Sequence, residues 1–240
     1  MEIKVFNTAA EVSNFVAEEI IKQVADNANT NLGVATGRTM DAIYHKFVQL
    51  AVAKKMDFSK MKAFAVDEYI GLAKGSRNSY ERYLHLHLFD QLNFTPENLF
   101  VPETHLNDVD KVCADYENAI KSAGGIDLQL LGIGLNGHIG LNEPGSAIDS
   151  RTRVVGLTSS TRNSNKVLFR SEEVPLTAVT MGIGTILESK RCLLVATGET
   201  KADIVQRVVN GDINSKVPAT ALKQHQNILM VLDKHAAKLI

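Results

Sequence analysis

Two stretches of the chain carry residue types suited to acid–base chemistry. The richer one is a glycine-rich run from Leu131 to Ser146, in which Glu143 follows His138 by five residues. A carboxylate beside a histidine can hold one tautomer of the imidazole, as in a base with its orienting partner. The other stretch contains Asp67 and Glu68, and a positioned carboxylate is a natural general base. A lone histidine is usually structural and adjacent acids are often only solvated, so their placement must decide.

Two further stretches could hold an anion. The first consists of Thr36, Gly37, Arg38 and Thr39, and the second of Thr197–Thr200 and Lys201. Each lies between an apolar run and a helical one, and the N–H groups at a helix N-terminus attract anions. Lys201 would stand at a helix start, which is unfavourable for a cation unless an anion lies between them. The simpler alternatives are a capped turn and a solvated lysine. Neither stretch has the Gly-Lys-Thr of a Walker loop, which argues against a nucleoside triphosphate.

The glycine-rich run also satisfies the GxGxxG pattern of dinucleotide-binding proteins through Gly132, Gly134 and Gly137. Pro144 follows too soon for the long helix that should carry a pyrophosphate, and the run lies in the middle of the chain. The glycines are better explained as positions where the backbone approaches a small ligand and places His138.

Short apolar runs precede all four stretches and predict the elements that position them. The runs are Asn31–Ala35, Lys62–Val66, Asp127–Leu131, Arg191–Ala196 and Asn227–Leu232. Their residues are apolar at consecutive positions, which is typical of parallel strands covered on both faces. Segments such as Glu11–Asp26 have apolar residues at helical spacing. The alternation predicts an α/β fold with an open, mostly parallel sheet and helices on both faces, whose ligand binds at the carboxyl ends of the strands.

Composition limits the remaining choices. A chain of 240 residues with 45% hydrophobic content suits a single α/β domain over residues 1–240. The 26 basic and 27 acidic residues give a net charge of −1, without the basic excess of a nucleic-acid-binding protein. Cys113 and Cys192 lack metal-site spacing and are expected to be buried thiols. We expect no signal peptide and no membrane span, and hence a cytoplasmic protein.

Taken together, these motifs resemble the glucosamine-6-phosphate deaminase (NagB) family. The similar segments are Leu32–Gly37, Asp67–Leu72, Gly132–Gly145, Ser150–Arg153 and Pro218–Thr220, in order and over nearly the whole chain. The resemblance implies a Rossmann-like α/β sandwich without a metal or organic cofactor. It also implies conversion of glucosamine 6-phosphate and water to fructose 6-phosphate and ammonia, in amino-sugar catabolism.

The resemblance assigns roles to individual residues. Asp67 would move a proton from C2 to C1 through an enediol-type intermediate, and His138 would help to open the pyranose ring. Glu143 and Asn136 would support the histidine. The implied substrate-binding residues are Thr36, Gly37, Arg38, Thr39, Gly137, Lys166 and Lys201. The sugar phosphate is the only partner implied, and the oligomeric state stays undetermined.

Three positions depart from the family pattern. Many members have Asp where this chain has Asn136, which can donate a hydrogen bond but brings no charge. The phosphate loop usually reads TGSTP or TGGTP, whereas here Arg38 replaces the variable third residue. The arginine of the family's Asn-Ser-Arg-Phe-Phe arm aligns with Lys166 or with Val167, and Arg162 is a further candidate cation. If Arg38 replaces that lost charge, Arg38→Ala should raise the Michaelis constant more than tenfold.

Four alternative functions remain at this point. A galactosamine-6-phosphate deaminase/isomerase would use the same catalytic residues. A 6-phosphogluconolactonase-like hydrolase would share the fold and phosphate loop but would not need the intact block Asp67–Tyr69. A non-catalytic sugar-phosphate-binding protein is supported only by the altered phosphate arm. A nicotinamide-dependent oxidoreductase has only the GxGxxG match in its favour.

Overall fold

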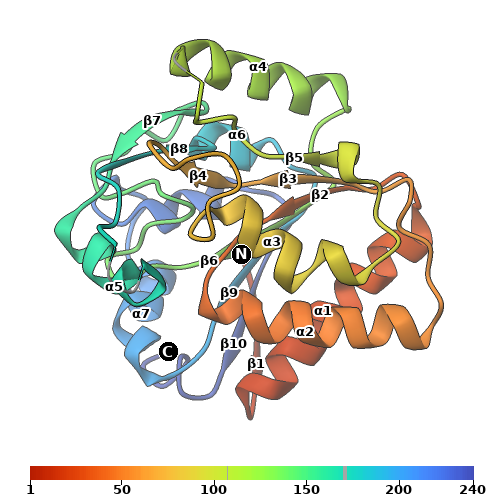
Figure 1. Ribbon diagram of the computed structural model, residues 1–240. Coiled ribbons are helices and arrows are strands. Elements are labelled where there is room, and N and C mark those ends of the chain that lie inside the picture. The colour runs from red at the N-terminus through yellow and green to blue at the C-terminus, as the bar shows by residue number, and fades with distance from the viewer. Residues whose placement is uncertain (107, 170–171) are drawn as a thin grey trace.

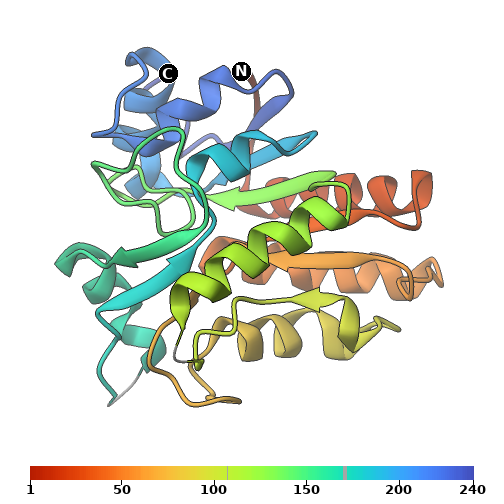
Figure 2. The same ribbon diagram turned by 90° about the horizontal axis from the view of Figure 1, so that it is seen from above.

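A seven-stranded parallel sheet forms the centre of the molecule, with helices on both faces. The computed structural model describes residues 1–106, 108–169 and 172–240. Figure 1 shows α4 and α6 on one side of the sheet and α1, α2 and α3 on the other, and Figure 2 shows the same layers from above. The predicted α/β class, the parallel sheet and the two covered faces are therefore confirmed.

The strands of the large sheet include all five predicted runs, to within about two residues at each end. In spatial order they are β1 (Glu2–Phe6), β10 (Ile228–Asp233), β9 (Cys192–Ala196), β6 (Leu128–Gly132), β2 (Asn31–Val34), β3 (Lys62–Ala65) and β5 (Leu99–Phe100). The edge strands β1 and β5 were not predicted. All residues of β9 and β10 are buried, which explains why their sequences are continuously apolar rather than alternating.

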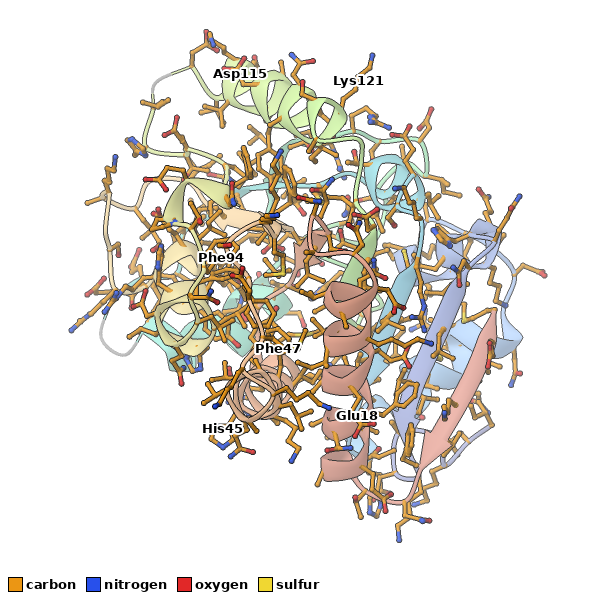
Figure 3. All side chains as sticks on the ribbon, turned by 90° about the vertical axis from the view of Figure 1, so that its right-hand side faces the viewer. Glu18, His45, Phe47, Phe94, Asp115 and Lys121 are labelled. Carbon is orange, nitrogen blue, oxygen red and sulfur yellow. The ribbon has the colours of Figure 1, made fainter. Side chains whose placement is uncertain are left out.

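The helices follow the strands in the expected alternation. They are α1 (Ala9–Asp26), α2 (Arg38–Ala53), α3 (Tyr80–His87), α4 (Val109–Ser122), α5 (Ser159–Phe169), α6 (Ile183–Leu187) and α7 (Ala202–Asn210), with short 3-10 turns at Phe89–Gln91, Pro96–Asn98, Glu199–Lys201 and Pro218–Gln224. Each major helix buries one face. Figure 3 shows Asp115 and Lys121 on the outside of α4, whereas the fully buried Phe47 of α2 lies in the interior.

A second sheet of three antiparallel strands was not predicted from the sequence. It consists of β4 (Asp67–Tyr69), β8 (Thr177–Thr180) and β7 (Arg153–Gly156), in that order. The chain passes almost directly from β3 into β4, so Asp67 and Glu68 lie in a buried strand and are not the solvated pair that was the simpler alternative. This small sheet supports one side of the candidate site.

Candidate active site

The order of strands in the large sheet brings the predicted loops together. Because β9, β6 and β2 are neighbours and parallel, their carboxyl ends lie side by side. The loops that follow them are the segment after Ala196, the glycine-rich run, and the Thr36–Thr39 turn. The β3–β4 connection adds Asp67 at the same edge. The predicted location of the site, at the carboxyl ends of the strands, is the location at which these residues meet.

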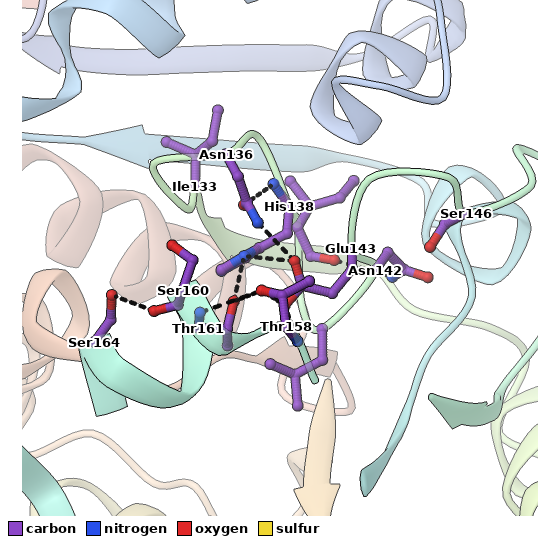
Figure 4. A network of polar contacts seen from close by, with 12 residues as sticks. Ile133, Asn136, His138, Asn142, Glu143, Ser146, Thr158, Ser160, Thr161 and Ser164 are labelled. Atoms are coloured by element: carbon purple, nitrogen blue, oxygen red, sulfur yellow. Dashed lines mark hydrogen bonds and ion pairs between the residues drawn. The ribbon is translucent and has the colours of Figure 1, made fainter. Parts of the chain in front are cut away.

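His138 and Glu143 form the centre of a polar network, which Figure 4 shows from close by. The imidazole Nδ1 lies 3.7 Å from Glu143 Oε2 and 3.4 Å from the hydroxyl of Thr161. No hydrogen bond of the described residues ends on Nε2, so this nitrogen is available to a ligand. Gly134 makes room for the ring, since a Cβ built there would lie 2.3 Å from Cε1 of His138.

Asn136 contacts both Glu143 and the backbone of His138. Its side-chain NH₂ donates to Glu143 Oε2 at 2.6 Å, and its carbonyl oxygen accepts the backbone N–H of His138 at 3.2 Å. Its amide therefore orients the carboxylate and the loop backbone, and only through them the imidazole. An aspartate at this position would bring a second negative charge next to Glu143, which the neutral amide avoids.

Glu143 is held in its ionised form. Burial opposes ionisation, but hydrogen bonds from His138, Thr161 and Asn136 outweigh it and lower the pKa of Glu143 to about 2. Thr158 adds its hydroxyl at 3.1 Å from Oε1. Because Glu143 stays charged at neutral pH, it stabilises a positive charge on the neighbouring imidazole.

Asp67 lies in the opposite kind of environment. Its side chain is almost completely buried, and no hydrogen bond or ion pair within the described ranges ends on its carboxyl group. Burial, and then the charge of Glu68, raise the pKa of Asp67 to about 8. Gly140, with φ +55°, brings the glycine-rich loop against it, because a Cβ at that position would lie 3.6 Å from Asp67 Oδ2.

Glu68 points away from its neighbour and binds backbone. Its carboxylate accepts the N–H groups of Tyr69, Tyr80 and Glu81 at 2.8, 3.0 and 2.8 Å. Burial raises the pKa of Glu68 to about 7, although these three donors act against the rise. The alternation of side chains along β4 thus leaves Asp67 for the cleft and uses Glu68 as a support.

The predicted phosphate-binding turn has free donors. Gly37 caps α2 with φ +108°, and no side chain caps the helix. Among the hydrogen bonds of the described residues, none uses the N–H groups of Arg38 and Thr39. Arg38 itself is exposed, so its proposed charge-replacing role stays a prediction.

Lys201 lies at the start of α7, as predicted: it is the last residue of the 3-10 turn Glu199–Lys201 and the N-cap of the helix. Its ammonium group donates to the carbonyl of Ile133 at 2.6 Å, and burial lowers its pKa. This contact places the charge against the glycine-rich loop. Gly137, with φ +88°, is packed there against Val217, which a Cβ would approach to 2.7 Å.

The two cations predicted on the phosphate arm are placed differently. Arg162 donates from Nε and one terminal nitrogen to the carbonyl of Val174, both at 3.2 Å. Its guanidinium therefore stabilises the local backbone. Lys166 is exposed on α5. The backbone of Val167 lies in the same helix. Lys166 therefore remains the candidate of this arm.

The sequence did not point to Thr158 and Thr161, which complete the polar network around Glu143. Both lie at the start of α5, where hydroxyls usually cap helices, so their types alone suggested nothing more. Among the residues that the structure describes, no group of three or more His, Cys, Asp or Glu side chains could hold a metal ion. In the same part of the chain, the helices are too short or too polar to span a bilayer.

Comparison with known proteins gives a consistent result. A family model described as glucosamine-6-phosphate isomerases/6-phosphogluconolactonase matches residues 6–231. A glucosamine-6-phosphate deaminase of Thermoanaerobacter sp. (strain X514) is 42% identical over 231 residues, or 96% of this chain and 91% of that protein. One from Clostridium novyi (strain NT) is 42% identical over 99% of both chains.

Solved structures agree. A monomeric glucosamine-6-phosphate deaminase superposes with a TM-score of 0.97 at 37% identity, over 100% of both chains. The 6-phosphogluconolactonase from Trypanosoma brucei gives 0.79 at 19% identity, over 99% of this chain and 97% of that one. The latter similarity concerns the fold alone.

Proposed function

The chain belongs to the family of glucosamine-6-phosphate isomerases and 6-phosphogluconolactonases, and we propose that it is a glucosamine-6-phosphate deaminase. It converts glucosamine 6-phosphate and water to fructose 6-phosphate and ammonia, a step of amino-sugar catabolism. The relatives at 42% identity that carry this name support the choice over a lactonase.

One observation carries the proposal: a buried carboxyl group, with no hydrogen-bond partner among the described residues, lies against the loop that bears His138. Removing a proton from a carbon next to a carbonyl requires a base whose pKa is close to the working pH. A pKa of about 8 suits Asp67 to this task. Hydrolysis of a lactone needs no carbon acid to be deprotonated and gives no reason for such a carboxylate.

Ring opening is the first step, and His138 catalyses it. Breaking the bond between C1 and the ring oxygen requires a proton on that oxygen and the loss of the proton of the C1 hydroxyl. Nε2 of His138 can take the proton of the C1 hydroxyl and pass it to the ring oxygen. Glu143 stabilises the imidazolium from the side of Nδ1. The product of this step is the open-chain amino aldehyde.

Asp67 then takes the proton from C2. The electron pair of the broken C–H bond forms the C1–C2 double bond, while the π pair of the C1 carbonyl moves to its oxygen, which takes a proton from the C2 ammonium group. The product is an enediol-type intermediate whose C2 carries a neutral amino group. The protonated Asp67 returns the proton to C1, which leaves an imine at C2. Water adds to C2 and ammonia leaves. These steps consist of proton transfers and hydrolysis, so the proposal includes no metal or organic cofactor.

The phosphate binds at the far side of the cleft in this proposal. Its ligands are the free N–H groups of Arg38 and Thr39, the hydroxyls of the turn, and Lys201. We place the reaction in the cytoplasm, where the free, buried thiols Cys113 and Cys192 would stay reduced. We propose that residues 1–240 form one domain, since β1 and β10 from opposite ends of the chain are neighbours.

An ammonia-release assay tests the proposal. Purified protein is given glucosamine 6-phosphate, galactosamine 6-phosphate or 6-phosphogluconolactone in parallel. Hydrolysis of the lactone is monitored through the acid that it releases. We expect ammonia and fructose 6-phosphate from the first substrate, with a kcat/KM at least tenfold above that for the second. Preferential turnover of galactosamine 6-phosphate, lactone hydrolysis alone, or no turnover at all would contradict it.

A further inference from the structure

Helix α3 is attached at its first turn to the strand that carries Asp67. The carboxylate of Glu68 accepts the N–H groups of Tyr80 and Glu81, which are the first two residues of the helix. Ser79 caps the same turn by accepting the N–H of Arg82 at 3.1 Å. A carboxylate that accepts the free N–H groups of a helix N-terminus also interacts favourably with the helix dipole, so it attaches the helix firmly.

One turn further, α3 reaches the phosphate-binding turn through Tyr83. Its hydroxyl has one proton, which it shares between the carboxylate of Asp41, in a short hydrogen bond, and the carbonyl oxygen of Gly37 at 3.2 Å. The ring stacks on His87 with centroids 4.3 Å apart, and burial raises the pKa of the phenol, so the hydroxyl remains a donor. Tyr83 thus joins α3 to the start of α2.

The contact at Gly37 matters because it fixes a peptide plane. The Gly37 carbonyl also accepts the N–H groups of Met40 at 2.8 Å and Asp41 at 3.3 Å. With φ +108° and no side chain, Gly37 has more rotational freedom than any other residue type would have. The orientation of its carbonyl determines that of the Arg38 N–H on the same plane, which is one of the two free donors of the turn.

We propose that Tyr83 is a positioning residue for the substrate's phosphate. Its hydroxyl holds the start of α2 through Asp41 and, with the same shared proton, the Gly37–Arg38 peptide, so that the N–H groups of Arg38 and Thr39 converge on one anion. Because α3 is also attached to Glu68, the helix keeps the phosphate-binding turn and Asp67 at a fixed separation. The inference rests on the proposed function, which assigns the phosphate to this turn.

The test compares Tyr83→Phe with the wild type. The variant keeps the ring and its stacking on His87 and loses only the hydroxyl. We expect the KM for glucosamine 6-phosphate and the competitive inhibition constant of inorganic phosphate to rise together, about fivefold or more, with kcat within twofold. A loss of general stability would instead lower the active fraction, and hence kcat, while both constants stayed unchanged. That second pattern would overturn the inference.

Tyr116→Phe is the matched control. Tyr116 lies in α4, and its hydroxyl donates to the carbonyl of Ala65 at 2.6 Å, so the control removes a buried hydroxyl away from the phosphate-binding turn. Its phosphate inhibition constant should equal that of the wild type. An equal rise in both variants would show a general effect and would overturn a specific role of Tyr83.

A second measurement does not depend on turnover. Inorganic phosphate should raise the Tm of the wild type and of Tyr116→Phe, and at the same concentration should raise that of Tyr83→Phe by much less. This comparison is informative even if the protein does not deaminate glucosamine 6-phosphate. Equal shifts in all three proteins, or no shift in the wild type, would overturn the inference while leaving the deaminase assay to be judged separately.

Discussion

Two buried carboxyl groups of the site, Asp67 and Glu143, have opposite pKa shifts because their surroundings differ. They are exposed to nearly the same small extent, 6% and 7%. Glu143 is surrounded by donors from Asn136, Thr158 and the imidazole, and its pKa falls to about 2. Asp67 has no such donor within the described residues and a charged neighbour, and its pKa rises to about 8. Burial raises the pKa of both groups, but the donors around Glu143 outweigh it, whereas at Asp67 burial acts together with the charge of Glu68.

The comparison assigns the two groups to different steps. A carboxylate that cannot be protonated near neutral pH is a poor proton acceptor but a good permanent charge beside a histidine. A carboxylate that is costly to ionise gains from accepting a proton, which favours transfer from carbon. The same pair of pKa values therefore predicts unequal effects of removing each charge.

The largest expected effect is that of Asp67→Asn. The amide has nearly the same shape but cannot take the C2 proton, so kcat for ammonia release should fall by about a thousandfold or more. Its affinity for inorganic phosphate should stay within twofold of the wild type, because the phosphate-binding turn is untouched. A kcat within tenfold of the wild type would mean that another group is the base.

Replacing the other carboxylate should cost less. Glu143→Gln removes the charge that stabilises protonated His138 and turns an NH₂ group toward the amide of Asn136 or the hydroxyl of Thr158. We expect kcat to fall by about ten- to a hundredfold, since ring opening also proceeds slowly without a catalyst. A higher temperature speeds uncatalysed ring opening, so it should reduce the difference in kcat between Glu143→Gln and the wild type. A loss as large as that of Asp67→Asn would erase the distinction between the two groups.

The smallest effect is a shift in pH dependence caused by Glu68→Gln. The charge of Glu68 contributes to the raised pKa of Asp67, so its removal should lower that pKa. Asp67 is then ionised at lower pH, and the acid limb of kcat/KM should move to lower pH than in the wild type. The position of the limb is the readout, because the altered cap of α3 could change the rate itself. A limb that stays in place or moves to higher pH contradicts the assignment.

Much of this arrangement could be predicted from the sequence, because buried parallel strands leave continuous apolar runs and polar residues follow them. The runs ending near Ala35, Leu131 and Ala196 placed the loops at one edge of the sheet. The small sheet was missed because β4 has only three residues, two of them acidic, and strands seldom begin with paired carboxylates. Its buried acids are explained by long-range contacts that no local pattern shows.

Contacts between residues that are distant in the sequence could not be predicted either. Thr158 and Thr161 reach Glu143 and His138 only after α5 has folded over the loop, and Glu68 supports a helix twelve residues further along. The sequence also could not show which of the cations Arg38, Arg162 and Lys166 is free, because that depends on the carbonyl of Val174. Residue types were enough to predict the chemistry, whereas the contacts that support the site residues could be seen only in the structure.

The central claim is that Asp67 is buried and has no partner in the part of the chain that the structure describes. It is tested most directly by the free energy of unfolding of wild type and Asp67→Asn between pH 4 and pH 9. With a folded-state pKa of about 8 against 3.8 when unfolded, Asp67 binds more protons in the native state, so wild-type stability falls as pH rises through this window. The asparagine variant lacks this loss, and its advantage should grow by up to about 1.4 kcal/mol per pH unit before levelling off above pH 8. A difference that is independent of pH, or that favours the wild type as pH rises, would contradict the account.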